Sequence, residues 1–326
     1  MPRLNVYAET WPLARTFTIS RGSRTEAHVV VAELEEDGIR GRGEGVPVPR
    51  YGLDAPAVVA QIETLRTALE GGLTREGLQD RLAPGPARCA LDCAFWDLEA
   101  KRSARPAWEL AGLDSPLPVV TALTISIDTP EAMAAAAAEA LGHPLLKIKL
   151  NGEQVVERVA AVRAAAPEAQ LVVDANEAWA PELIPEVLPK LADLGVAMVE
   201  QPLPADADRA LAGLERAVPL CADESCHDSA SVDGLEGRYD LVNVKLDKTG
   251  GLTEALKLKA AAEARGLQIM VGCMIGTSLS MAPGMLVAQG AAVVDLDGPL
   301  WLTEDRGEGL FYEQGLVHPP MAALWG

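Results

Sequence analysis

The sequence predicts an α/β protein whose larger part is a parallel (β/α)-barrel and whose smaller part is an α+β domain. Three observations lead to this fold class. The chain has 326 residues, enough for one large or two ordinary domains. Beyond about residue 118, short apolar strands alternate with helical segments. Charged side chains recur at the ends of these strands with nearly constant spacing, as they do at the active-site rim of a barrel.

The composition excludes several classes of protein. Hydrophobic residues make up 49% of the chain and charged residues 23%, which is typical of a globular protein. No apolar run approaches the roughly 18 residues of a membrane-spanning helix, and the N-terminal segment lacks the apolar core of a secretory signal. The net charge of −19 argues against nucleic acid or a membrane as a partner. The five cysteines form no CxxC pair, which favours reduced thiols and a cytoplasmic location.

The α+β domain is expected to occupy residues 1–115. Its predicted elements are two strands, at 27–34 and 41–46 around the turn Glu36-Asp37-Gly38, and two helices, at 56–69 and 87–102. The segment 112–118 is rich in Gly, Pro and Ser and is the expected domain boundary.

The barrel is expected to occupy residues 116–300. Short apolar runs predict eight buried strands at 119–125, 145–150, 171–174, 197–200, 220–222, 241–244, 268–272 and 291–296. The Ala- and Glu-rich intervals between them favour helices, for instance 130–141 and 252–265. An open doubly wound sheet is the alternative, but no GxGxxG follows any strand. Residues 301–326 are expected to return to the first domain.

Three acidic residues stand at the ends of consecutive predicted strands. Asp174, Glu200 and Asp223 are 26 and 23 residues apart, so we expect them at one rim of the barrel. Three carboxylates at one point repel each other unless a cation neutralises them. Oxygen ligands without His or Cys favour Mg²⁺, with Mn²⁺ as the alternative ion. Any one of these acids alone could be a solvated loop residue or a helix cap, but the periodic register argues against that for all three.

Lysines stand at the ends of two other strands. Lys147 and Lys149 are two residues apart on one strand, so their side chains share a face, and Lys245 follows a strand on the opposite side of the barrel. Lysines crowded by one another and by a metal have lowered pKa values, as a general base requires. The alternative is that they are surface lysines at strand ends. The acids and lysines together predict a metal-dependent enzyme that moves a proton on a carbon next to a carboxylate.

These motifs resemble those of the enolase superfamily, in its muconate-lactonizing branch. The matching segments are KIK at 147–149, VDANE at 173–177, VEQP at 199–202, ADES at 222–225 and NVKLDKTGG at 243–251. Within this branch the chain resembles the dipeptide epimerases that act on L-Ala-D-Glu and L-Ala-L-Glu. The resemblance extends from Trp11 to Trp301, and the series of motifs is specific to the branch.

The resemblance implies a modified (β/α)7β barrel under an α+β capping domain formed by both ends of the chain. It also implies that Asp174, Glu200 and Asp223 bind one Mg²⁺ per subunit, which chelates the carboxylate of the substrate. By the same resemblance, Lys149 and Lys245 remove and return the α-proton on opposite faces. Lys147 helps to hold the enediolate charge, an electrostatic contribution that usually dominates catalysis of this kind.

Two further features favour a dipeptide substrate. Asp295 and Asp297 share a face of the last strand, and in dipeptide epimerases a matching pair binds the α-ammonium of the substrate. An arginine in the Gly-containing loop at 20–25 is suited to pair with a side-chain carboxylate such as that of Glu, and the resemblance implies Arg24 as the better candidate, with Arg21 second. The alternatives are strand-end caps and a solvated turn arginine. The resemblance adds Thr124, Cys273, Met274 and Ile275 as residues that line the substrate site.

The resulting hypothesis is Mg-dependent epimerisation of the C-terminal residue of dipeptides by two-lysine 1,1-proton transfer through an enediolate. The first alternative is o-succinylbenzoate synthase or muconate-type cycloisomerase activity at the same site, with substrates that carry no ammonium. The second is a non-catalytic metal-dependent binding protein, against which the lysine pair argues. The resemblance implies a role in murein-peptide metabolism, and a homo-oligomer is compatible with the sequence.

Overall fold

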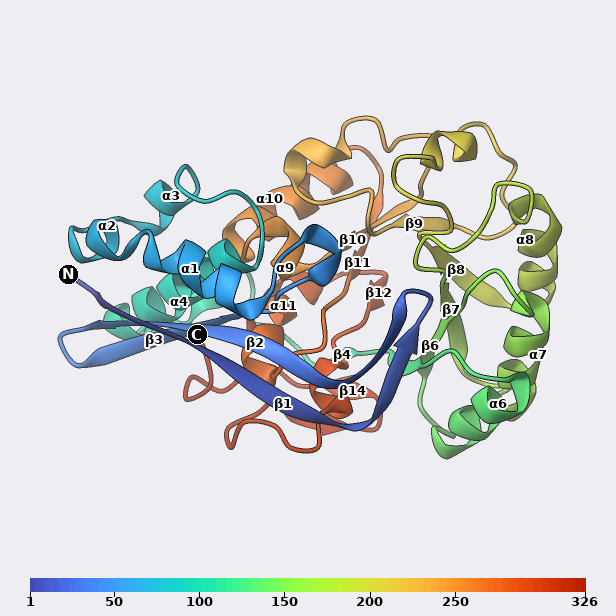
Figure 1. Ribbon diagram of the computed structural model, residues 1–326, viewed down its shortest axis with the longest axis horizontal. Coiled ribbons are helices and arrows are strands. Elements are labelled where there is room, and N and C mark those ends of the chain that lie inside the picture. Colours follow the sequence, from blue (N-terminus) through green and yellow to red (C-terminus); the bar gives the residue numbers. More distant parts are fainter.

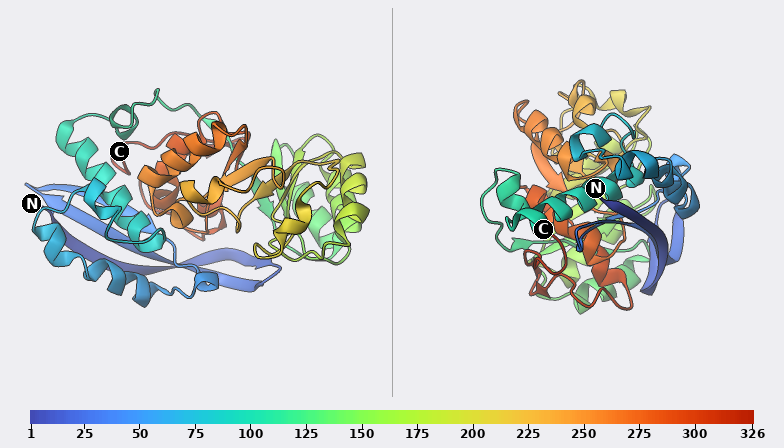
Figure 2. Two further views of the ribbon diagram at one scale, coloured as in Figure 1. Left: turned by 90° about the horizontal axis from the view of Figure 1, so that it is seen from above. Right: turned by 90° about the vertical axis from the view of Figure 1, so that its left-hand side faces the viewer.

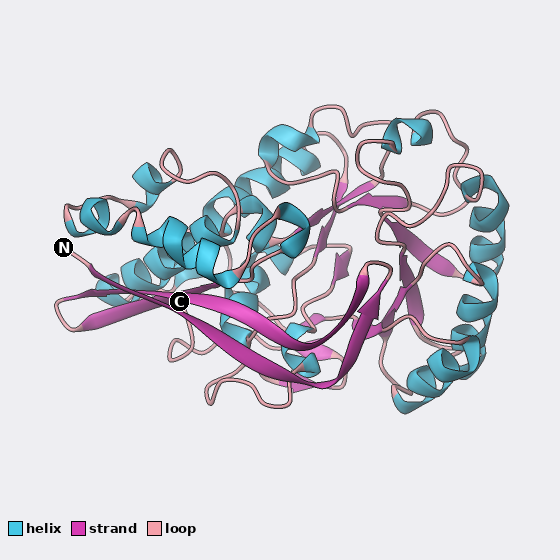
Figure 3. Cartoon of the chain, in the orientation of Figure 1, coloured by secondary structure: helices cyan, strands magenta, loops and turns pink.

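The computed structural model describes residues 1–326 and places an elongated antiparallel sheet beside a barrel of parallel strands (Figure 1). The N-terminus and the C-terminus both lie on the side of the antiparallel sheet (Figure 1 and the left view of Figure 2). Helices line the outer side of the barrel strands (Figure 3). No helix has both the length and the apolar character that crossing a membrane requires.

The antiparallel sheet has three strands in the order β1-β2-β3, with bounds Arg3–Ile19, Gly22–Glu36 and Ile39–Gly45. The predicted strands at 27–34 and 41–46 are confirmed as parts of β2 and β3, and Asp37 and Gly38 form the turn with positive φ angles of 55° and 79°. β1 was not predicted from the sequence, and it is half-exposed along most of its length. β1 and β2 extend as a hairpin whose tip reaches the barrel (Figure 1).

Helix α4, at Pro86–Ser103, lies directly against β3. The alternate glycines Gly41, Gly43 and Gly45 permit this contact, because a Cβ atom at each of them would lie 2.1–2.3 Å from a backbone oxygen of α4. The predicted helix at 87–102 is confirmed, whereas the one at 56–69 is divided into α1 at Ala55–Glu63 and α2 at Arg66–Glu70. Two short helices, α3 at Arg75–Leu78 and α5 at Ala107–Leu110, complete this part.

The barrel sheet contains eight strands whose spatial order follows the sequence, from β5 to β12. Their bounds are Leu123–Ile125, Leu145–Lys149, Gln170–Asp174, Val196–Glu200, Leu220–Ala222, Leu241–Val244, Gln268–Val271 and Val293–Val294. All neighbouring pairs are parallel. A hydrogen bond of 2.8 Å from the Ala122 N–H to the Val294 carbonyl connects the first strand region to the last. The predicted barrel is therefore confirmed, and the sequential order excludes the doubly wound alternative.

Helices follow most barrel strands but not all of them. The regular ones are α6 at Pro130–Glu139, α7 at Val155–Ala165, α8 at Ile184–Asp193, α10 at Leu252–Glu263 and α11 at Ser278–Ala288, with a single turn α9 at Leu246–Thr249. After β8 and β9 the chain forms only the 3₁₀ turns η2 at Asp208–Leu211 and η3 at Ser229–Val232. The prediction that helices fill every interval is therefore wrong at these two places. The remaining 3₁₀ turns are η1 at Pro49–Tyr51 and η4 at Gly298–Trp301.

The end of the chain returns toward the antiparallel sheet. The predicted strand at 119–125 is divided into β4 and β5, and β4 at Val119–Val120 pairs with a C-terminal hairpin formed by β13 at Tyr312–Glu313 and β14 at Leu316–Val317. The last residues then contact α4: the Trp325 indole donates to the Cys93 carbonyl at 2.9 Å, and the Gly326 N–H donates to Asp97 Oδ1 at 2.7 Å.

Candidate active site

The interior of the barrel consists of an apolar layer and, two residues further along each strand, a polar layer. The apolar layer is Ala122, Leu145, Val172, Met198, Cys221, Leu241, Met270 and Val293. Because alternate residues of a strand face the same way, the residues two positions later also face inward. They are Thr124, Lys147, Asp174, Glu200, Asp223, Asn243, Gly272 and Asp295, all of them buried. The predicted acids and Lys147 thus occupy equivalent inward-facing positions on their strands and lie together inside the barrel.

Lys147 lies in the middle of the polar layer and is 1% exposed. Its Nζ is 2.7 Å from Glu200 Oε2, 2.7 Å from Asp295 Oδ2 and 3.2 Å from Asp174 Oδ2. Burial lowers the pKa of Lys147, but these three carboxylates raise it well above its ordinary value. Lys147 therefore places a fixed positive charge beneath the site.

The two predicted bases approach the site from opposite sides. Lys149 is the last residue of β6 and Lys245 follows β10, and these strands are four positions apart in the eight-stranded order. Lys149 Nζ is 2.5 Å from Asp174 Oδ2, and Lys245 Nζ is 2.7 Å from Asp223 Oδ2. Gly272 makes room for Lys245, because a Cβ atom there would lie 3.0 Å from the Lys245 Cε atom.

The pKa of Lys245 is raised in this structure, which is opposite to the prediction that crowding lowers it. Burial lowers the pKa of Lys245, but Asp223 and Glu200 outweigh burial and raise it. Burial likewise raises the pKa of Asp174, yet Lys149 and Lys147 bring it below its ordinary value. Asp223 thus favours the charged form of Lys245, and each lysine would lose its acid partner if that acid bound a cation instead.

Asp174, Glu200 and Asp223 fit a divalent cation by their chemistry and by their position. Asp174 and Glu200 are register partners on β7 and β8, and Asp223 directly follows β9, the next strand of the sheet. Their side chains here are turned toward lysine ammonium groups, and no three acids surround a common point closely enough to hold an ion. Glu200 Oε2 is buried and forms no hydrogen bond, so its contact with Lys147 is an ion pair only. This oxygen is therefore available to a cation. All three residues are carboxylates, which are the kind of ligand that suits Mg²⁺.

A cavity of about 750 Å³ lies above the polar layer, between the barrel and the antiparallel sheet. Its barrel side includes the two bases, Asp223 and most of the predicted substrate contacts: Thr124, Cys273, Met274, Ile275, Asp295 and Asp297. Two segments of the first domain cover it, the hairpin tip between β1 and β2 and the turn around η1. Lys147, Asp174 and Glu200 are fully enclosed and do not line the cavity.

Asp295 and Asp297 line the cavity and have different partners. Asp295 Oδ2 contacts Lys147, whereas its Oδ1 is buried without a hydrogen-bond partner. Asp297 Oδ2 accepts from the Thr124 N–H at 2.8 Å and from the Trp301 indole at 3.1 Å. Burial and the charge of Asp295 raise the pKa of Asp297 to about 6. A cationic group in the cavity would supply the partner that Asp295 Oδ1 lacks.

The structure distinguishes the two candidate arginines. Arg21 Nη1 lies 2.9 Å from Glu224 Oε1 and 3.4 Å from Glu177 Oε2. Arg24 also lines the cavity but pairs with no acid, and partial burial and repulsion by Arg21 lower its pKa. An arginine that is partly desolvated and has no counterion attracts an anionic ligand. Arg24 is therefore the arginine of the tip without an acid partner, and its contact with the substrate stays a prediction.

Two buried residues of the site were not assigned roles from the sequence. Lys248 Nζ donates to Asp223 Oδ1 at 2.6 Å and to the carbonyl groups of Asp223 and Asn243 at 2.5 and 3.0 Å. Asn243 Nδ2 donates to Glu200 Oε1 at 2.7 Å. Because side chains alternate along a strand, Asn243 shares the face of Lys245, and its position inside the barrel could have been predicted from the sequence. Lys248 reaches the site only because α9 turns the chain back, which no strand pattern shows.

Two family models match the chain and together cover most of it. Residues 1–112 match the mandelate racemase / muconate lactonizing enzyme N-terminal domain, and residues 131–323 match the enolase C-terminal domain-like family. The chain belongs to the mandelate racemase / muconate lactonizing enzyme family of the enolase superfamily. The family predicted from the motifs at the strand ends is thereby confirmed.

Two relatives within this family have named activities. The L-Ala-D/L-Glu epimerase of Escherichia coli K12 is 49% identical over 320 residues, which is 98% of this chain and 100% of that protein. An N-acetyl-D-glutamate racemase from a Pseudoalteromonas species is 43% identical over 302 residues, covering 91% of this chain and 94% of that protein.

Solved structures of the family agree with this relationship. An enolase family member from Agrobacterium tumefaciens with homology to dipeptide epimerases, containing sodium and L-Ala-L-Glu with an ordered loop, has a TM-score of 0.98 and 51% identity over 100% of both chains. A dipeptide epimerase from Enterococcus faecalis V583, complexed with Mg and L-Leu-L-Tyr, has a TM-score of 0.91 and 31% identity over 99% of this chain and 98% of that one. The predicted resemblance to dipeptide epimerases is confirmed.

Proposed function

We propose that this chain is an isomerase that epimerises the C-terminal residue of L-Ala-D-Glu and L-Ala-L-Glu. The observation that carries the proposal is the placement of Lys149 and Lys245 on opposite sides of one cavity, with buried carboxylates between them. Inversion at a carbon requires that a proton leaves one face and another arrives on the other face. Two lysines in this arrangement supply an acid or base to each face.

The reaction is a 1,1-proton transfer. Neutral Lys149 takes the α-proton, and the electron pair of the broken C–H bond delocalises into the adjacent carboxylate. The Lys245 ammonium group then donates a proton to the opposite face of the α-carbon. The product forms with Lys149 charged and Lys245 neutral, and the reverse reaction starts from this protonation state.

Asp174, Glu200 and Asp223 are the residues that would hold Mg²⁺, or Mn²⁺ as the alternative. Such a cation, when bound, stabilises negative charge on the substrate carboxylate. Lys147 supports the same charge from beneath with an ammonium group that is fixed by three acids. The relative from E. faecalis, whose structure contains Mg, supports this choice of ion.

The other charges of the dipeptide also meet opposite charges. Asp295, with its unpartnered oxygen, and Asp297 face the side where the free α-ammonium would bind. Arg24, which has no acid partner, is available to the side-chain carboxylate of Glu. A cycloisomerase substrate has no ammonium and would leave Asp295 Oδ1 buried and unsatisfied.

We also propose that the enzyme acts in the cytoplasm on murein-derived peptides. All five cysteines are free thiols, which suits a reducing compartment. The role in murein-peptide metabolism is what the resemblance to L-Ala-Glu epimerases implies.

Solvent exchange tests the proposed function. Incubation of either dipeptide in D₂O with Mg²⁺ should place deuterium at the α-carbon of the C-terminal residue and yield both epimers, as followed by NMR. The absence of exchange with both dipeptides would refute the proposal. N-acetyl-glutamate, the substrate type in the name of the Pseudoalteromonas relative, serves as a comparison; a strong preference for it would show that the substrate class is wrong.

Replacement of Asp297 by Gly distinguishes dipeptide epimerase activity from the cycloisomerase alternative. If the substrate carries an ammonium group, Asp297→Gly should strongly reduce activity. A variant that retains full activity toward o-succinylbenzoate synthase or muconate-type substrates would instead support the alternative.

A further inference from the structure

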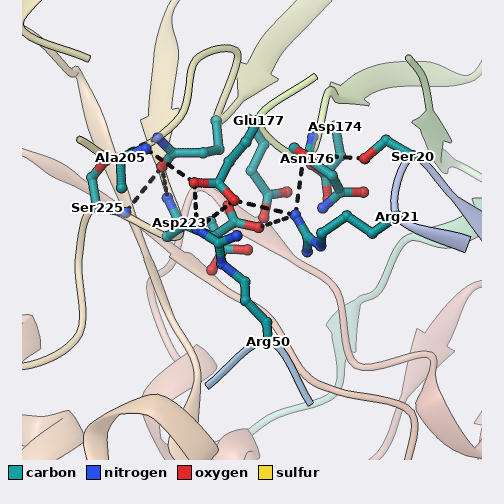
Figure 4. A network of polar contacts seen from close by, with 12 residues as sticks. Ser20, Arg21, Arg50, Asp174, Asn176, Glu177, Ala205, Asp223 and Ser225 are labelled. Carbon is teal, nitrogen blue, oxygen red and sulfur yellow. Dashed lines mark hydrogen bonds and ion pairs between the residues drawn. The ribbon is translucent and has the colours of Figure 1, made fainter. Parts of the chain in front are cut away.

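Two segments of the first domain meet at one carboxylate of the barrel. Arg21 comes from the hairpin tip between β1 and β2, and Arg50 comes from η1. Both arginines extend toward Glu177, which lies in the loop after β7 (Figure 4). These are the two segments that cover the cavity.

Glu177 joins these segments through both of its carboxylate oxygens. Its Oε2 lies 2.6 Å from Arg50 Nη2 and 3.4 Å from Arg21 Nη1. Its Oε1 accepts from Arg50 Nη2 at 2.7 Å and from the Ala205 N–H, in the loop after β8, at 3.0 Å. The Glu177 side chain is only 7% exposed. An ion pair between exposed side chains contributes little, but this carboxylate is enclosed and shared by two arginines and a backbone N–H.

The backbone around Glu177 fixes the direction of its side chain. Asn176 and Glu177 both have positive φ angles, 44° and 65°, which residues other than glycine seldom adopt. The Glu177 N–H donates to the Gln201 carbonyl at 2.8 Å. The Asn176 carbonyl accepts from Ser20 Oγ and from Arg21 Nη1, each at 3.1 Å. The loop after the predicted metal ligand Asp174 is therefore shaped to receive the hairpin tip.

These contacts also determine which arginine remains for the substrate. Arg21 is engaged by Glu177, Glu224 and the Asn176 carbonyl, while Arg24 on the same tip has no acid partner. If Arg21 were released, the tip would keep only the Ser20 Oγ hydrogen bond to the Asn176 carbonyl on this side of the rim. On the other side, the Thr18 N–H donates to Ser126 Oγ at 3.2 Å and the Thr18 carbonyl accepts from the Ile127 N–H at 3.2 Å.

We propose that Glu177 is a positioning residue: it holds the hairpin tip and the η1 turn over the cavity so that Arg24 faces the side-chain carboxylate of the substrate. This inference rests on the proposed function, since it assigns Arg24 to a Glu-containing dipeptide. Glu177 acts through Arg21 and Arg50 and touches neither the reacting carbon nor the lysines that move its proton.

Steady-state kinetics test the inference. Glu177→Gln keeps the size of the side chain and removes its charge, and we expect it to raise KM for L-Ala-L-Glu by at least about tenfold, the loss typical of a charged hydrogen bond. kcat should stay within about threefold because the lysines and the acids of the polar layer are untouched. In an Arg24→Gln background, Glu177→Gln should have almost no further effect on KM. Glu182→Gln, an exposed change in the same loop, is the matched control and should change neither constant.

Hydrogen–deuterium exchange provides a measurement that does not depend on catalysis. In Glu177→Gln, backbone amides of residues 16–27 and 48–54 should exchange at least about tenfold faster, while those of the barrel strands should not change. Unchanged exchange in both segments would overturn the inference, as would a fall in kcat without a change in KM, or additive effects of Glu177→Gln and Arg24→Gln. Absence of epimerisation by the wild-type protein would instead refute the proposed function, and the exchange data would still decide whether Glu177 holds the tip.

Discussion

Lys149 and Lys245 approach the cavity from strands four positions apart, so each can reach one face of a bound substrate. Removal of one lysine should therefore separate proton exchange from inversion. In Lys245→Ala we expect epimerisation to fall by about 10²-fold or more, while Lys149 still exchanges the α-proton of one epimer in D₂O. Lys149→Ala should show the reverse preference. NMR of each dipeptide in D₂O measures both processes.

The control for this prediction is Lys190→Ala, which removes a lysine whose side chain is 53% exposed, on α8. It should leave exchange and inversion unchanged. Exchange of both epimers by Lys245→Ala would contradict the assignment of one base to each face.

Arg24 should determine the preference for an acidic C-terminal residue. Replacement of Arg24 by Gln removes the unpaired guanidinium group, and we expect kcat/KM for L-Ala-L-Glu to fall by roughly ten- to hundredfold. Activity toward L-Ala-L-Ala, which has no side-chain carboxylate, should change by less than about threefold. Equal losses with both dipeptides would contradict this role.

The sequence predicted the residues of the site that lie on barrel strands, and the reason is periodicity. Asp174, Glu200 and Asp223 stand at the ends of regularly spaced strands, and Lys147 and Lys149 share a face because side chains alternate along the strand. Glu177 and Arg50 could not be found in this way. Their contact depends on how the hairpin tip and η1 dock on the barrel, and no local sequence pattern encodes this docking.

Among the structural elements, the barrel strands were the most predictable, because strands buried on both faces are continuous apolar runs. β1 escaped prediction because it is half-exposed and contains Pro12, so its pattern is not that of a buried strand. The intervals after β8 and β9 contain 3₁₀ turns, and their sequences, rich in Asp, Pro and Gly, resemble loops more than helices.

The connection from β3 to η1 is held by Asp247 of α9. Asp247 Oδ1 accepts from the Val46 N–H at 2.7 Å, and burial, with a smaller repulsion from Glu44, raises the pKa of Asp247 to about 7. Lys245 also acts on this carboxyl group and lowers its pKa. Since the pKa is above its ordinary value, the folded protein binds this proton more tightly than the unfolded chain does. The resulting stabilisation is present below about pH 4 and is lost as the pH rises to about 7.

Asp247→Asn should remove this part of the pH dependence, because an amide oxygen still accepts from the Val46 N–H and carries no proton. We expect the free energy of unfolding to fall less steeply between pH 4 and pH 7 in Asp247→Asn than in the wild type. Urea unfolding at several pH values measures this slope. Asp206→Asn, an exposed change, is the control, and identical slopes for Asp247→Asn and the wild type would contradict the prediction.

At the scale of the whole molecule, the last residues fasten the end of the chain to α4. The Trp325 side chain is 1% exposed, and Gly326 accepts a hydrogen bond from the Ala107 N–H at 3.1 Å as well as donating to Asp97. Deletion of Trp325 and Gly326 should lower the free energy of unfolding by about 3–5 kcal/mol, the usual effect of losing a buried Trp. Urea unfolding should also show a smaller loss for Trp325→Phe, which keeps most of the apolar contact. A truncated protein within about 0.5 kcal/mol of the wild type would contradict this account.

The fold class was predictable from the alternation of strand and helix, and the return of the chain end to the first domain was expected. How the elements of the first domain pack on each other and on the barrel was not predictable. It depends on close approaches such as that of β3 and α4 across Gly43, which become visible only when both elements are placed. The domain limits at 115 and 300 stay predictions, as does the formation of a homo-oligomer.

The chemistry and the recognition of the substrate come from different parts of the chain. The lysines proposed to move the proton and the acids proposed to hold a cation lie on or directly after β6 through β10, whereas Arg24 belongs to the hairpin tip and Asp295 and Asp297 follow β12. A lineage can therefore alter what it recognises by changing the tip or the last strand while it inherits the reaction unaltered. Laboratory evolution confined to residues 17–28 should shift this enzyme among dipeptides without rebuilding its chemistry.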